Sequence, residues 1–227
     1  MQNVPLYIRK QSIHYIKIFF ELDSSQNLAK NSYYIRALLV KAQVEAIKQV
    51  ETNAKAEAAV EILSNAIKQV QTAVDIIAKP ENKAKYSTLV YNASIITINI
   101  LRHYLKTNWA GNFYEILEKI SALLEESDDV DHNWRIFILI KLAEAYMEAD
   151  KKAEGQKALD KIGDVLKKRG DCEFMDELYR MRIHLQRDNN GALGNLKKEG
   201  ETSTTYPQFK YIYTVQAIKS NILTEKD

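Results

Sequence analysis

Four histidines and one cysteine are the side chains of this sequence that most often bind metal ions or act as catalysts. The histidines are His14, His103, His132 and His184. None of them has a partner ligand at the short spacing of a zinc motif, so we expect surface or boundary positions for them. Cys172 has no neighbouring feature that would activate a thiol. We therefore predict no catalytic residue, no metal site and no cofactor, and we expect the protein not to be an enzyme.

The acidic segment EESDDVDH, at positions 125–132, is the sharpest local charge feature. A calcium loop would need alternating oxygen ligands, a turn glycine and a distal glutamate, and the glycine is missing. Helix ends explain the segment better. Glu125 and Glu126 end one helix, and Asp128, Asp129 or Asp131 caps the next, where a negative charge is favourable.

The basic run KKRG, at positions 167–170, has a similar explanation, because cations favour a helix C-terminus and glycine can end the helix. The alternative is contact with an acidic surface such as tubulin or nucleic acid. Tyr33, Tyr34, Tyr211 and Tyr213 are either interface anchors or half-buried core residues. The chain has no glycine-rich phosphate loop.

The composition is that of an ordinary globular protein, with 46% hydrophobic residues, 27% charged residues and a formal net charge of +2 over 227 residues. This length allows one large domain or two small ones. The balanced charge gives no general attraction to nucleic acid. The first residues do not resemble a secretory signal. The single cysteine rules out an internal disulfide and fits a reducing compartment.

The run from Tyr86 to Leu101 carries no charge. Its 16 residues are fewer than the ~20 mostly apolar residues that span a bilayer. We therefore expect a helix that is buried by neighbouring helices, and we expect no membrane partner. Ala93 and Ser94 are small enough to allow a close approach, and Asn92 and Asn99 could satisfy polar groups between helices.

Hydrophobic spacing elsewhere predicts helices joined by short turns. The first 110 residues contain no glycine, and Lys79-Pro80 should end a helix. Apolar residues at steps of three or four predict the buried faces. These are Tyr33, Ala37, Val40, Val44, Ile47 and Val50; Ala59, Leu63, Ala66, Val70, Val74 and Ile77; Phe113, Ile116, Leu117, Ile120 and Leu124; Trp134, Phe137, Ile138, Leu142, Ala145 and Tyr146; Leu159, Ile162 and Leu166; and Phe174, Leu178, Met181 and Leu185.

These segments predict an all-α fold of about eight or nine helices and no strand. We expect an array of antiparallel helix hairpins over residues 1–187, a polar loop over 188–206 and a final helix over 207–227. One stretch fits the register of a tetratricopeptide unit, through Leu139, Leu142, Ala143, Tyr146, Gly155 and Leu159. It departs from the pattern at Ile162 and Lys167. The array is therefore predicted to be a degenerate, tetratricopeptide-like α-solenoid.

Three segments resemble the N-terminal region of the family of cilia- and flagella-associated protein 46. The most specific is LVYNAS, at Leu89–Ser94; the others are Trp134-Arg135 after the acidic loop, and LAEAYMEADKKAEG, at Leu142–Gly155. The resemblance runs from near Pro5 to the C-terminus and is strongest between Lys85 and Leu159. The family's chains continue far beyond this length, so functions of their later regions do not transfer.

The resemblance implies a structural scaffold subunit of the motile-cilium axoneme, in a projection of a central-pair microtubule. Its implied partners are other large cilia- and flagella-associated proteins, calmodulin and tubulin. The family has no catalytic residues to transfer. The main alternative is a generic cytosolic helical-repeat adaptor that binds proteins or peptides. An enzyme with an all-helical pocket would need convergent titratable groups, and a nucleic-acid module would need a basic surface; neither is evident.

Overall fold

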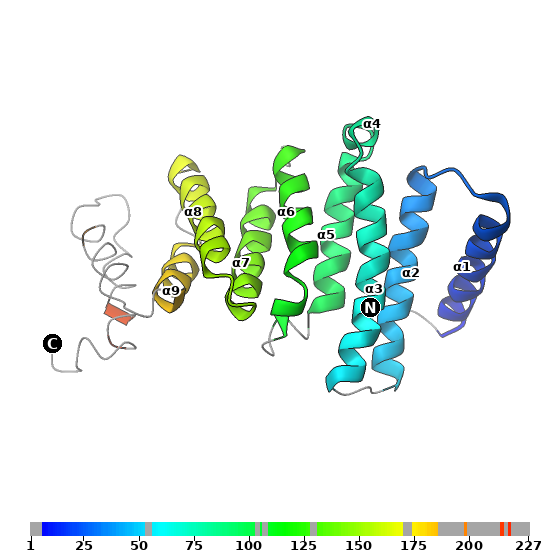
Figure 1. The fold of residues 1–227 in the computed structure, drawn as a ribbon, viewed down its shortest axis with the longest axis horizontal. Coiled ribbons are helices and arrows are strands. Elements are labelled where there is room, and N and C mark those ends of the chain that lie inside the picture. Colours follow the sequence, from blue (N-terminus) through cyan, green and yellow to red (C-terminus); the bar gives the residue numbers. More distant parts are fainter. Residues whose placement is uncertain are drawn as a thin grey trace. The chain divides into compact units, whose positions relative to one another are not determined.

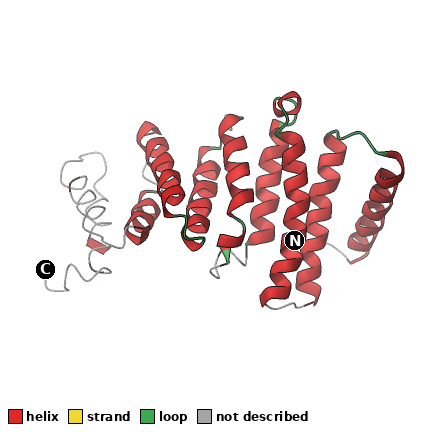
Figure 2. Cartoon of the chain, in the orientation of Figure 1, coloured by secondary structure: helices red, strands yellow, loops and turns green. Residues whose placement is uncertain are grey.

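The computed structural model describes residues 6–52, 56–102, 105, 109–127, 131–169, 174–185, 198, 214, 215 and 218. In chain order, the helices are α1 (Leu6–Gln26), α2 (Ser32–Thr52), α3 (Ala56–Ile77), α4 (Pro80–Lys83), α5 (Ser87–Leu101), the 3-10 helix η1 (Ala110–Asn112), α6 (Tyr114–Glu126), α7 (His132–Glu148), α8 (Lys152–Arg169) and α9 (Met175–Leu185) (Figure 1). No strand occurs among the described residues (Figure 2). The predicted all-α class is confirmed.

The chain divides into two compact units. Unit 1 comprises Met1–Thr107 and Glu115–Val130, and unit 2 comprises Asn108–Tyr114 and Asp131–Asp227. In unit 1, α2 packs on both α3 and α5, α3 packs on α5, and α1 packs on α2. In unit 2, α7 packs on η1, α8 and α9, and α8 packs on α9. Each unit therefore has its own set of helix–helix contacts.

The uncharged run forms α5, and it is buried on most of its sides, as predicted. Ala93 and Ser94 are completely buried. The two buried hydroxyl groups are satisfied within the helix: Ser94 Oγ donates to the Tyr91 carbonyl at 2.6 Å, and Thr97 Oγ1 donates to the Ala93 carbonyl at 2.8 Å. Within the part of the chain that the structure describes, no helix has the length and apolarity needed to cross a membrane.

The predicted role of Asn92 and Asn99 between helices is wrong, because both side chains are exposed. With Thr88, they occupy positions separated by four and seven residues, which lie on one side of a helix. This polar stripe is the side of α5 that its neighbours leave open. The helix therefore needs no asparagine to satisfy buried groups, since its own carbonyls already do so.

The buried face predicted for α2 is also wrong. Tyr33 is 74% exposed and Val40 is 39% exposed. The core face consists instead of Tyr34, Ile35, Leu38, Leu39 and Ala42. Helix α2 carries apolar residues on two opposite sides, and packing on α3 and α5 buries only one of them.

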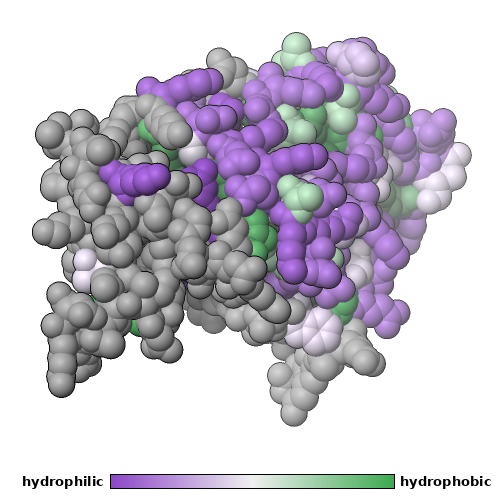
Figure 3. Space-filling model, turned by 60° about the vertical axis from the view of Figure 1, so that its left-hand side comes forward, coloured by the Kyte–Doolittle hydropathy of each residue, from purple (hydrophilic) through white to green (hydrophobic). Residues whose placement is uncertain are grey.

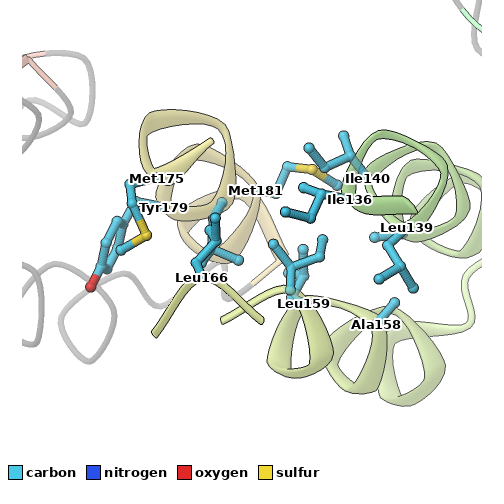
Figure 4. Close-up of a cluster of buried hydrophobic side chains, with 12 residues drawn as sticks. Ile136, Leu139, Ile140, Ala158, Leu159, Leu166, Met175, Tyr179 and Met181 are labelled. Atoms are coloured by element: carbon cyan, nitrogen blue, oxygen red, sulfur yellow. The ribbon is translucent and has the colours of Figure 1, made fainter. Parts of the chain in front are cut away.

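The predicted faces of α3 and α6 are confirmed where the structure describes them, whereas the predicted face of α7 is buried at Ile138, Leu142, Ala145 and Tyr146 but not fully at Trp134 and Phe137. The buried residues of α3 include Leu63, Ala66, Val70, Val74 and Ile77, and those of the segment around α6 are Phe113, Ile116, Leu117, Ile120 and Leu124. In unit 2, α7, α8 and α9 enclose one apolar cluster (Figure 4). It contains Ile136, Leu139, Ile140, Ala143, Ala158, Leu159, Ile162, Leu166, Met175, Leu178, Tyr179 and Met181. Trp134 and Phe137 are half-buried and stack with their ring centroids 5.2 Å apart.

Helix ends agree with the sequence patterns. Helix α3 ends at Ile77, and Pro80 begins α4. Helix α6 ends at Glu126, and the Asp131 side chain caps α7 by accepting a hydrogen bond from the Trp134 amide at 3.0 Å. Residues 128–130, 170 and all but a few of residues 188–227 lie outside the described residues. The predicted polar loop and final helix remain predictions.

Candidate interaction sites

The residues singled out for chemistry do not gather into a site. His14 and His132 are exposed, as expected, and His184 lies on α9. His103 and Cys172 lie outside the described residues. No group of three or more potential metal ligands occurs in the part of the chain that the structure describes. The candidate sites are therefore helix surfaces and the turns that position them.

The turn between α7 and α8 is closed by backbone hydrogen bonds. Asp150 adopts the left-handed conformation, with φ of 56°. Its amide donates to the Met147 carbonyl at 3.2 Å, and the Lys151 amide donates to the Tyr146 carbonyl at 2.8 Å. This pair of bonds is a Schellman motif, in which an aspartate occupies the position usually taken by glycine. The motif sets the direction in which α8 leaves α7.

A close contact between α7 and α8 involves residues of the predicted tetratricopeptide register. A Cβ atom placed on Gly155 would lie 3.7 Å from Tyr146 Cβ and 3.8 Å from the Ala143 carbonyl oxygen. Gly155 therefore lies next to Ala143 and Tyr146, which are two other residues of the predicted tetratricopeptide register. A larger side chain at position 155 would press against the backbone of α7.

The 3-10 helix η1 lies against the C-terminal end of α7. The Gly111 amide donates to Glu148 Oε2 at 3.0 Å, and a Cβ on Gly111 would lie only 3.0 Å from the Ala149 nitrogen. Beside this contact, the Tyr114 and Tyr146 rings lie 5.6 Å apart, and Lys151 Nζ lies 4.4 Å from the Tyr114 centroid. Glycine at 111 therefore permits a close approach that a side chain would disturb.

The turn between α1 and α2 is organised by a charged side chain. Asn27 has φ of 50°, and its amide donates to the Asp23 carbonyl at 2.8 Å. The Asp23 carboxylate accepts hydrogen bonds from the Leu28 amide at 3.0 Å, from Lys30 Nζ at 2.9 Å and from the Tyr34 hydroxyl at 2.8 Å. These bonds fasten the end of α1 to the start of α2.

Electrostatics in this turn follow from those contacts. The hydrogen bonds from Lys30 and then Tyr34 favour the ionised carboxylate and lower the pKa of Asp23 below its ordinary value of 3.8. Tyr34 and, more weakly, the Asp23 carboxylate raise the pKa of Lys30, against the opposing effect of desolvation. The Asp23–Lys30 pair therefore stays charged across the physiological pH range.

Unit 1 also contains a small pocket of about 360 Å³. Its walls are mainly apolar, and Lys83 and Glu126 form an ion pair of 2.5 Å beside it. The lining residues are Ile77, Lys83, Ala84, Ser87, Val90, Leu123, Glu126 and Ser127. Lys83 and Glu126 are the charged residues of the lining, and they pair with each other.

Exposed apolar side chains identify the surfaces that sequence reasoning missed. On the face in Figure 3, polar residues cover most of the described surface. Among the residues whose burial is described, the exposed large hydrophobic ones are Tyr15, Ile18, Leu22, Tyr33, Val40 and Ile218. The spacing of Tyr15, Ile18 and Leu22, by three and four residues, is a signal that the sequence already contained.

No protein-family model matches the chain, and no solved structure matches it.

Proposed function

We propose that this protein is a non-catalytic structural scaffold subunit of the motile-cilium axoneme, in a projection of a central-pair microtubule. The single observation that carries the proposal is the resemblance of LVYNAS, Leu89–Ser94, to the family of cilia- and flagella-associated protein 46. Four side chains of this segment, those of Leu89, Val90, Ala93 and Ser94, are buried in α5. The resemblance therefore involves residues on which packing depends.

We also infer that the helices form an array of antiparallel hairpins that resembles a tetratricopeptide solenoid. The contact of Gly155 with Ala143 and Tyr146 supports this inference, because the repeat pattern places small residues where its two helices approach closely. The Schellman motif at Asp150 supports it as well, since it reverses the chain within a few residues.

In this proposal, the protein acts by holding neighbouring subunits in place. Helix arrays present long surfaces that bind partners without chemistry. Other large cilia- and flagella-associated proteins would occupy these surfaces, and calmodulin and tubulin would be reached through the assembly. Scaffolding of this kind lets the projection transmit force to the radial spokes.

Fractionation of motile cilia tests the proposal. Membranes are removed with detergent, the axonemes are washed at rising salt, and the chain is quantified in each fraction by mass spectrometry. Retention with wild-type axonemes and loss from mutants without a central pair are the expected results. Release with the detergent-soluble fraction, or absence from cilia, would contradict the proposal and favour a general helical adaptor.

A further inference from the structure

We draw no further inference here: the strongest candidate, the stripe of exposed apolar side chains that Tyr15, Ile18 and Leu22 form on α1, carries none, because nothing among the residues that the structure describes shows what covers it.

Discussion

Helices α5 and α7 each bury eight residues, and they do so by different means. Helix α5 has no charged residue, and its buried hydroxyls bond to its own carbonyls. Helix α7 is also largely buried, yet it keeps Lys141 and Glu144, which pair at 2.7 Å with side chains about one-fifth exposed. A largely buried helix can therefore contain charged residues if they pair with each other, because only an unpaired buried charge carries a large free-energy cost.

The turns of the two units differ in a similar way. Asn27 and Asp150 both adopt the left-handed conformation at a helix end. The turn at Asp150 is closed by two backbone bonds, whereas at Asn27 the following amide, that of Leu28, bonds to the Asp23 carboxylate. The turn in unit 1 therefore depends on an ionised side chain, and the turn in unit 2 does not.

The largest expected effect comes from a charge placed in either enclosed helix. Ala93→Arg and Ala143→Arg each replace a completely buried side chain. Each should destabilise the fold by about 4 kcal/mol, because an unpaired charge would lose its hydration. Denaturant unfolding measures the change, and Asn92→Arg, at an exposed position of α5, is the control. An unchanged unfolding midpoint for either buried variant would contradict the assignment of these helices to the core.

Removal of the cap on α7 should have a smaller effect. Helix α5 begins at Ser87, and its N-cap residue, Tyr86, makes no side-chain cap, whereas Asp131 caps α7. Asp131→Ala should cost about 1 kcal/mol, since the Trp134 amide loses its acceptor. Thermal unfolding checks this, and Asp131→Ser should retain most of the stability. Equal losses for the two variants would indicate that the cap is not the cause.

A glycine in the turn of unit 2 should stabilise the protein. Asp150→Gly removes the steric cost of a side chain at φ of 56° and should add about 0.5 to 1 kcal/mol. Asn27→Gly should add less, because asparagine tolerates this conformation better than most residues. Thermal midpoints of the two variants give the comparison, and destabilisation by Asp150→Gly would contradict the Schellman geometry.

Acid should affect the turn of unit 1 selectively. The pKa of Asp23 is lower in the folded state than its ordinary value of 3.8. Its contribution to stability is therefore complete above that value and is lost as pH falls through the folded-state pKa. Amide hydrogen exchange at Leu28 should accelerate over this acidic range, while exchange at Lys151 should not show the same dependence.

Asp23→Asn is the matched variant, because it removes the titrating group and keeps a side chain of similar size. Its Leu28 exchange should already be faster near neutral pH, with little further change on acidification. A wild-type acid response that persists in Asp23→Asn would assign the titration to another group.

Local features were predictable because they depend on neighbours in the chain. The end of α3 before Pro80, an aspartate cap at the start of α7 and the core face of α3 follow from short-range sterics, hydrogen bonding and helical periodicity. The sequence left Asp128, Asp129 and Asp131 open as that cap, and the structure assigns Asp131. The absence of a catalytic cluster was also predicted from residue types and spacing, and this prediction remains untested. The exposed position of His14 and His132 agrees with the expectation for those residues.

The choice between alternative faces required the tertiary structure. Helix α2 has apolar residues on opposite sides, so periodicity favoured Tyr33 and Val40 while packing buried Ile35 and Leu38. Asn92 was expected to lie between helices, but it is exposed, because the neighbouring helices cover the other sides of α5.

The sequence by itself determined that this protein is helical, where several of its helices end and that its uncharged run is buried, because backbone sterics and the separation of apolar from polar residues act locally. Only the tertiary structure decided which apolar side of α2 enters the core and which remains exposed beside α1. The physical reason is that burial depends on the surfaces of neighbouring helices, which are distant in the chain.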